Sequence, residues 1–224
     1  MRLSVLKSGS KGNCYVLSDE NGEVLILDAG VRSKDIKEAL QYDFSKVSGV
    51  LVTHEHKDHS LSAGELEKYG LEVWKPYLVE TEIDRRTFGK YAVSSFRVPH
   101  EDIPCYGFYI RHINGFKMIY VTDYEYVKYT FSKQKVHAIL CEANWSKEFV
   151  ETDTAYAEHK ILGHASLDVC KGFIETNKSE ELRAVVICHT SNAIDIPRAK
   201  DEIRQIVGDG VLVDCAGKGK VIEL

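Results

Sequence analysis

The stretch Val47-Ser48-Gly49-Val50-Leu51-Val52-Thr53-His54-Glu55-His56-Lys57-Asp58-His59 joins an apolar run of strand length to three histidines and a carboxylate. Side chains two apart on an extended segment point the same way, so we expect His54 and His56 to bind one cation together. Asp58 and His59 lie beyond them, where the chain is expected to enter a helix at Ser60, and can face a second cation. The alternative, a chance cluster on a solvated loop, is disfavoured because the cluster directly follows a buried strand.

Polar residues follow other apolar runs in the same manner. They stand at the end of a predicted strand or one residue beyond it: Asp28, Asp123, Glu142 and His189. Strand ends at one edge of a sheet can converge on a site that loops complete. We expect His100 to complete the ligands of the first cation and His189 those of the second. Asp123 is placed to bridge the two.

The remaining pattern predicts sheets packed together with helices outside. Strands are predicted at 3–6, 14–18, 23–28, 47–52, 95–98, 107–111, 117–122, 137–141 and 182–188, with short strands in 211–224. Helices are predicted at 33–41 (capped by Ser33), 60–69, 161–177 and 197–207. Strands dominate the first half, and strands alternate with helices in the second. No repeat or linker interrupts residues 1–224, so a single domain is predicted.

Composition narrows the classes of function. The 224 residues are 44% apolar, and 29 basic against 34 acidic residues leave a net charge of −5, which argues against broad electrostatic adhesion to nucleic acid. It leaves open a nucleic acid gripped locally by metals and a few lysines. Six scattered cysteines without a CxxC pair are expected to be buried thiols of a reducing cytoplasm. No signal-peptide region or membrane span is seen, so a soluble, cytoplasmic protein without a membrane partner is predicted.

With these motifs, the sequence resembles the metallo-β-lactamase-fold hydrolase superfamily over nearly its whole length. Leu25-Ile26-Leu27-Asp28-Ala29-Gly30 is similar to the first motif of that family, the histidine cluster to the second, and His100, Asp123 and His189 to the later ones. The resemblance implies an α/β fold, a four-layer αββα sandwich of two mixed β-sheets with helices outside. It places Asp28 behind the ligands as their support. It also implies two divalent cations, zinc in the first place and manganese as an alternative, which activate a hydroxide for hydrolysis.

Two further segments are similar to the phosphodiesterase branch of the superfamily. These are Cys141-Glu142-Ala143-Asn144 and Gly163-His164-Ala165-Ser166, and His100-Glu101-Asp102-Ile103-Pro104-Cys105-Tyr106-Gly107 resembles ribonuclease Z. The resemblance implies that His164 protonates the leaving oxygen and that Glu142 orients it, while Asp58 orients the attacking water or accepts its proton. The alternative for His164 is a surface histidine at a helix end. With the turn Ser8–Asn13, these segments look most like the YycJ/WalJ-type group of exonuclease-like members.

The sequence is compatible with several functions. The favoured function is phosphodiester cleavage by a nuclease of the DNA exonuclease kind, with a nucleic acid or nucleotide as partner. A cyclic-nucleotide phosphodiesterase, a thioester or lactone hydrolase of the glyoxalase II type and a structural metal-binding module are the alternatives. Ser10, Asn13 and Asn192 are candidate substrate contacts, and a homodimer is left open. The other histidines (His112, His137 and His159) and the tyrosines 120, 124, 126 and 129 are assigned structural places, although tyrosines can stack on bases.

Overall fold

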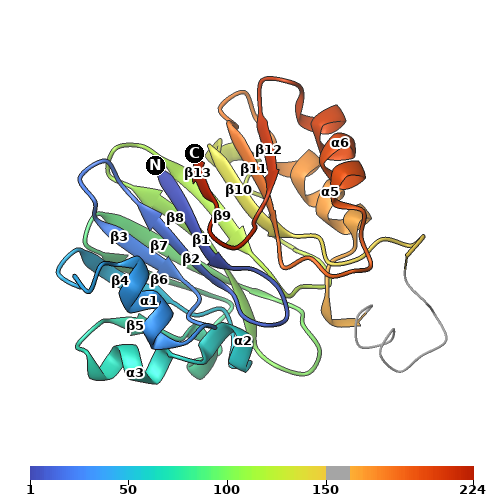
Figure 1. Cartoon of the computed structure of the whole chain (residues 1–224). Helices are drawn as coiled ribbons and strands as arrows, with labels where there is room; N and C mark the ends of the chain where they lie inside the picture. The colour runs from blue at the N-terminus through green and yellow to red at the C-terminus, as the bar shows by residue number, and fades with distance from the viewer. Residues whose placement is uncertain (150–161) are drawn as a thin grey trace.

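Two mixed β-sheets face each other and carry helices on their outer sides (Figure 1). The structure is a computed structural model, and it describes residues 1–149 and 162–224. The first sheet has the order β13-β1-β2-β3-β4-β5 and the second the order β12-β11-β10-β9-β8-β7-β6. In the first sheet the strands are β1 (Arg2–Lys7), β2 (Cys14–Ser18), β3 (Val24–Leu27), β4 (Val47–Leu51), β5 (Val73–Trp74) and β13 (Val221–Glu223). In the second they are β6 (Ile83–Phe88), β7 (Tyr91–Val98), β8 (Cys105–His112), β9 (Lys117–Val121), β10 (Ala138–Glu142), β11 (Ala184–Cys188) and β12 (Leu212–Cys215).

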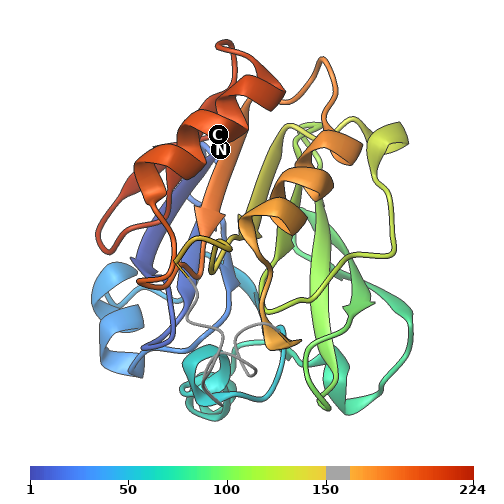
Figure 2. The same cartoon turned by 90° about the vertical axis from the view of Figure 1, so that its right-hand side faces the viewer.

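The helices form the two outer layers. The helices near the first sheet are α1 (Ser33–Ala39), α2 (Lys57–Ser60) and α3 (Ala63–Lys68), and those on the second are α5 (Leu167–Asn177) and α6 (Ile196–Val207). Figure 2 shows α5 in orange and α6 in red lying along the outer face of the second sheet. Short 3₁₀ helices occur at η1 (Pro76–Leu78) and η2 (Ser132–Gln134). This arrangement confirms the predicted sandwich of two mixed sheets with helices outside.

Three apolar clusters correspond to the three interfaces between these layers. One lies between the sheets, where Leu17 and Leu27 of the first sheet share a cluster with Phe108 and Leu140 of the second. A second cluster joins the outer face of the first sheet to α1 and α3, and a third joins the outer face of the second sheet to α5 and α6. Strand residues alternate between the two faces, so each sheet is buried on both sides.

Strand direction brings the predicted site residues to one edge. β9, β10, β11 and β12 are parallel, and β7 runs with them because it is antiparallel to β8, which is antiparallel to β9. In the first sheet β3 and β4 are also parallel. The carboxyl ends of parallel strands meet at the same edge of a sheet. The loops that follow β3, β4, β7, β9, β10 and β11 therefore share one end of the sandwich.

Three predicted elements differ from the structure. The histidine cluster enters its helix earlier than expected, because α2 begins at Lys57 and already contains Asp58 and His59; a break at 61–62 separates it from α3. Ser33 is not the N-cap of α1: that position is Arg32, and no side chain caps the helix. His164 to Ser166 interrupt the predicted helix at 161–177, since Ser166 is the N-cap of α5 and accepts from the Val169 N–H. Residue 161 lies outside the described residues.

The sequence patterns missed β5 and β6. β5 has only two residues, and β6 (Ile83–Phe88) is a mostly exposed edge strand with Asp84, Arg85 and Arg86 in it, so neither carries the apolar signature of a buried strand. All six cysteines are free and buried, as expected. Among the described residues, none of the helices is both long and apolar enough to cross a bilayer.

Candidate metal centre

Seven side chains from four segments, those that follow β4, β7, β9 and β11, converge at the common edge of the two sheets. Their ligand atoms form overlapping groups within which all atoms lie within 4.8 Å of one another. One group is His54, His56 and His100, another is Asp58, His59 and His189, and a third joins Asp123 to His54 and His59. The structure therefore brings together all seven residues predicted as metal ligands. Their assignment as ligands remains a prediction.

The first group presents three imidazoles. The Thr53 hydroxyl lies 3.0 Å from Nδ1 of His54 and donates to Asp28, so Nδ1 of His54 carries the proton and Nε2 has a free lone pair. That Nε2 is buried and has no hydrogen-bond partner. His100 is fixed in the same way, because its Nδ1 donates to the carbonyl of Gly163 at 2.5 Å and leaves Nε2 facing His56 Nδ1 at 3.5 Å. Unpartnered, buried lone pairs of this kind fit a cation.

Burial and neighbouring imidazoles keep two members of this group, His54 and His56, neutral. Burial, followed by the proximity of His59, lowers the pKa of His54 well below its usual value. Burial and His100 lower the pKa of His56 as well. Metal binding requires neutral imidazole, so these two histidines need release no proton near neutral pH.

The second group mixes imidazoles with carboxylates. Nε2 of His59 lies 3.2 Å from Asp123 Oδ2 and 3.4 Å from Asp58 Oδ2, and Nε2 of His189 lies 3.5 Å from Asp58 Oδ2. Although burial opposes the charged form, the carboxylates raise the pKa of His189 to about 10, with Asp123 the strongest of them. The same balance raises the pKa of His59, and the two histidines lower the pKa of Asp123 well below its usual range.

Asp28 lies behind the cluster and accepts hydrogen bonds from three neighbouring residues, while its role as a support of bound metal stays a prediction. Its Oδ1 accepts from the Thr53 N–H at 2.8 Å, and its Oδ2 accepts from Nδ1 of His59 at 2.7 Å and from the hydroxyl of Tyr120 at 2.5 Å. These bonds orient His59 with Nε2 toward the other ligand atoms. Thr53 and Tyr120 were not predicted as site residues. The signal for Thr53 was its place beside His54, whereas Tyr120 is brought in only by the packing of one sheet on the other.

Glu142 and His164 lie beside the second group. Oε1 of Glu142 is 2.8 Å from Nδ1 of His164 and 2.9 Å from Nδ1 of His189. The rings of His164 and His189 are stacked, with centroids 5.1 Å apart and planes 16° apart, and His164 Nδ1 lies 3.5 Å from Asp123 Oδ1. His164 is not a surface histidine at a helix end, because it is mostly buried and Ser166 caps α5.

Backbone strain coincides with the site. Asp28, Asp123 and His189 adopt positive φ values of 58°, 52° and 47°, and each lies at most two residues beyond the end of a strand. Non-glycine residues rarely adopt this conformation, and strained residues of this kind cluster at functional sites. Gly30 is required for another reason: a Cβ at this position would lie 1.6 Å from the Asp58 carbonyl oxygen. The loop after β3 can therefore approach the metal-binding loop only with glycine there.

The candidate substrate contacts and the remaining histidines and tyrosines lie in different parts of the fold. Ser10 and Asn192 are exposed, whereas Asn13 is fully buried, with its Nδ2 3.0 Å from Nε2 of His59 and its Oδ1 accepting from the Gly9 N–H.

His112 and His137 are buried in other parts of the fold, and His159 lies outside the described residues. Tyr120 and Tyr124 are core residues, while Tyr126 is exposed. Ser8 and Asn144, which were not predicted, hold the His189 backbone from its N–H and carbonyl sides.

Comparison with known proteins supports the fold. Residues 8–112 match the metallo-beta-lactamase superfamily. The structure resembles the metallo-beta-lactamase fold protein YhfI from Bacillus subtilis with a TM-score of 0.73 at 16% identity, covering 100% of this chain and 99% of that one. The first half of the chain is therefore similar to that superfamily, and the whole chain has the metallo-β-lactamase fold.

Two proteins that are similar to this chain in sequence are named as exodeoxyribonucleases. The chain is 37% identical to Exodeoxyribonuclease YycJ of Bacillus anthracis over 151 residues, which cover 57% of this chain and 56% of that protein. It is 27% identical to Exodeoxyribonuclease WalJ of Streptococcus pneumoniae over 196 residues, 74% of this chain and 72% of that protein. The match thus spans little more than half the length of the Bacillus anthracis protein. The predicted resemblance to this group is confirmed.

Proposed function

We propose that this protein is a metal-dependent phosphodiesterase that cleaves nucleic acid, with DNA as the first candidate and exonuclease-like action. The observation that carries the proposal is the Glu142–His164 pair beside the cluster of ligand atoms, 2.8 Å apart. The names of the similar proteins support the same choice of substrate.

The ligand set fits two divalent cations that share Asp123. His54, His56 and His100 would hold one cation, and Asp58, His59 and His189 the other. Such a pair of cations, when bound, supplies a hydroxide nucleophile at neutral pH and neutralises charge on the phosphate. The family of the domain supports divalent metal in general; the number of ions and zinc as their identity are part of the proposal.

The chain's own residues would handle the protons. Glu142 Oε1 accepts from Nδ1 of His164, which fixes the ring and stabilises its charged form, as a carboxylate does behind a catalytic histidine. His164 would then protonate the departing oxygen, a role worth roughly 10² to 10⁴-fold in rate. Asp58, a quarter exposed at its side chain, is placed to orient the attacking water from the open side of the cluster.

Glu142 and His164 could instead be ligands themselves, because they form a further group with Asp123 and His189. Against this, Glu142 Oε1 already accepts from two imidazoles and its Oε2 faces the backbone N–H groups of Tyr124 and Ala165, both at 3.4 Å. A carboxylate occupied in this way positions histidines and has little left for a cation.

His164→Ala separates the two roles. We expect it to retain the cation content of the wild type, measured by elemental analysis, and to lose about 10²-fold or more in kcat. His137→Ala is the matched control. The side chain of His137 is also 11% exposed, but His137 precedes β10, whereas the partner of His164, Glu142, is the last residue of that strand. Loss of metal in His164→Ala, or unchanged kcat, would contradict the role of His164 as proton donor.

A panel of substrates tests the class of reaction. The purified protein, supplied with zinc or manganese, is assayed on 5′-phosphorylated single-stranded DNA, RNA, a cyclic nucleotide and an acyl thioester. We expect DNA to have the highest kcat/KM. Preference for the cyclic nucleotide would make the protein a small-molecule phosphodiesterase, and cleavage of the thioester alone would overturn the proposal.

A further inference from the structure

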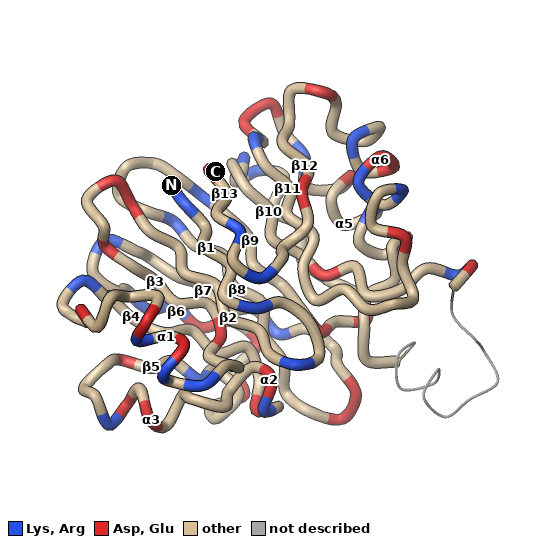
Figure 3. Tube along the Cα trace, viewed as in Figure 1, with Lys and Arg blue, Asp and Glu red and all other residues tan. Residues whose placement is uncertain are grey.

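A basic pocket of about 630 Å³ lies beside the metal centre, between the turn after β1, the helix α1 and the bend before β13. Its size is within the roughly 300–1,000 Å³ range of ligand sites. Five basic residues and only two acidic ones line it, in a chain whose net charge is −5. The lining charges are Lys7, Lys11, Arg32, Lys218, Lys220, Asp35 and Glu38. Figure 3 shows the basic segments in the turn after β1 and in the bend before β13.

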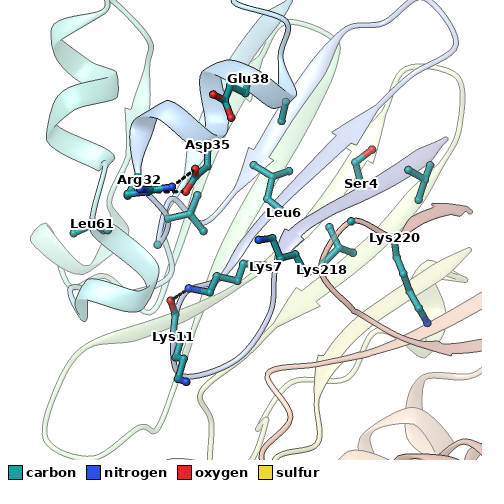
Figure 4. Close-up of a pocket in the computed structure, with 16 residues that line it drawn as sticks. Ser4, Leu6, Lys7, Lys11, Arg32, Asp35, Glu38, Leu61, Lys218 and Lys220 are labelled. Carbon is teal, nitrogen blue, oxygen red and sulfur yellow. Dashed lines mark hydrogen bonds and ion pairs between the residues drawn. The ribbon is translucent and has the colours of Figure 1, made fainter.

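Two of the five cations are already neutralised. Arg32 forms an ion pair with Asp35 at 2.8 Å, and Lys220 turns out of the pocket to bind Asp214 at 2.9 Å (Figure 4). Lys7, Lys11 and Lys218 have no carboxylate partner within ion-pair distance among the described residues. Lys7 instead donates to the carbonyl of Lys11 and so holds the turn, and Lys218 extends across the pocket toward it (Figure 4). The pocket therefore has a surplus of positive charge that an anion would neutralise.

The pocket and the candidate metal centre share a wall, in which the backbone of Gly30 packs against the backbone of Asp58. Gly30 lines the pocket, and its other side lies against the Asp58 carbonyl. Lys7 and Lys11 flank Ser8, whose hydroxyl accepts from the His189 N–H, and the same turn reaches Asn13, which contacts His59. The pocket and the cluster are thus the two sides of one turn, Ser8–Asn13.

The lining selects phosphates over bases. Its residues include no aromatic ring on which a base could stack, and its apolar part is aliphatic, from Leu6, Val31 and Leu61. Lysine ammonium groups bind phosphate as point charges and without regard to sequence. A polymer with a phosphate at every step supplies negative charge on both sides of the turn. A cyclic mononucleotide has only one phosphate, which the metal centre would take.

We propose that this pocket binds the phosphodiester backbone of the nucleic-acid strand whose scissile phosphate lies at the metal centre. The inference rests on the proposed phosphodiesterase function and specifies its substrate as a strand longer than a mononucleotide. Lys11 and Lys218 contact the backbone, and Lys7 positions the turn between the two sites.

The test compares the variant Lys11→Gln/Lys218→Gln with the control Lys133→Gln/Lys135→Gln. The control removes the same charge from the segment before β10, at the end of the second sheet that is remote from the metal centre. Binding of a fluorescent single-stranded 20-nucleotide DNA is measured by anisotropy in EDTA, so that it does not depend on catalysis. We expect the pocket variant to weaken binding about tenfold and to reduce the slope of log K against log salt by about 1.4, while the control pair stays near the wild type. Equal effects of the two pairs would overturn the proposal.

Hydrolysis assays separate this proposal from the proposed function. With metal present, kcat/KM of the pocket variant should fall about tenfold more on the 20-nucleotide DNA than on bis(p-nitrophenyl) phosphate, which cannot span the turn. An equal loss on both substrates would overturn the pocket assignment. If the wild type hydrolyses neither substrate but the pocket variant still binds DNA more weakly, the proposed function fails and the pocket assignment stands.

Discussion

The two halves of the ligand set differ in charge although they lie side by side. His54, His56 and His100 form a half made only of imidazoles, whereas Asp58, His59 and His189 mix imidazoles with a carboxylate. Burial and mutual repulsion lower the pKa of His54 and His56, while carboxylates raise those of His59 and His189. His54 and His56 of the first half are thus neutral near pH 7. In the second, protonated histidines neutralise the carboxylates that a cation would otherwise neutralise.

The buried carboxylates of the second half are paired with histidines. Unpaired buried charges are costly, so each of these carboxylates needs a partner of opposite charge. Here His59 and His189 are those partners, and a cation would replace their protons. Asp123 is common to both halves, because its carboxylate lies with His54 and His59 in one group and with His189 in another.

The largest effect is expected from Asp123→Ala, which removes the oxygen atoms shared by the two halves. We expect both cations to be lost or weakened and kcat/KM to fall by about 10³-fold or more. Elemental analysis and initial rates measure the two effects. Asp214→Ala is the control, a carboxylate paired with lysines away from the cluster. Two tightly bound cations in Asp123→Ala would show that the halves are independent.

His100→Ala and His189→Ala test whether each half holds its own cation. Because their ligands belong to different groups, each variant should lose about one of the two cations and about 10²-fold in kcat. Titration with zinc, followed by calorimetry, would show which affinity disappears. Loss of the same binding step in both variants would merge the two halves into a single site.

Asp28→Asn should act on the second half more than on the first. Asp28 binds Nδ1 of His59 directly, but it reaches His54 only through the Thr53 hydroxyl. Removal of such a supporting carboxylate typically costs about 10- to 100-fold in metal affinity. We expect that loss for the cation bound by His59. An equal loss in both binding steps would contradict the distinction between direct and indirect support.

The smallest effect concerns Asp214, which shows how a carboxylate behaves when its partners are lysines. Although burial opposes it, hydrogen bonds from Lys200 and Lys220 lower the pKa of Asp214 to about 2. A lowered pKa contributes stability that is present above the unfolded value, about 3.9, and is lost as the pH falls through 2. Asp214→Asn should therefore cost about 1–2 kcal/mol at pH 7 and less near pH 2. Urea unfolding at the two pH values measures the difference; a constant cost would rule out the charge as its origin.

Much of the site could be read from residues adjacent in sequence. The spacing of His54, His56, Asp58 and His59 predicted two neighbouring groups of ligands, and the structure has both. The strands before Asp28, Asp123 and His189 were strong predictions, since short apolar runs ending in a polar residue are distinctive. The edge strand β6 and the early start of α2 were missed, because exposed strands and single helical turns have weak local signatures.

Other features arise only when distant segments pack together. Tyr120 reaches Asp28 across the interface between the sheets, and Asn13 meets His59 because the loop after β3 packs tightly at Gly30. The basic pocket likewise joins Lys7 and Lys11 to Lys218, more than 200 residues away in the chain. Patterns within a short stretch of sequence cannot predict these contacts between distant residues.

The sequence by itself determined the residue types and their order: ligands placed after apolar strands, and a glycine where the backbone must approach closely. Only the tertiary structure decided which candidate ligands lie together, which carboxylate stands behind which histidine, and where the surplus lysines gather. The physical reason is the distance along the chain over which each effect acts. Periodicity and turn chemistry act over a few residues, whereas the direction of β7, β9, β10 and β11 aligns their carboxyl ends at one edge and sets every distance in the site.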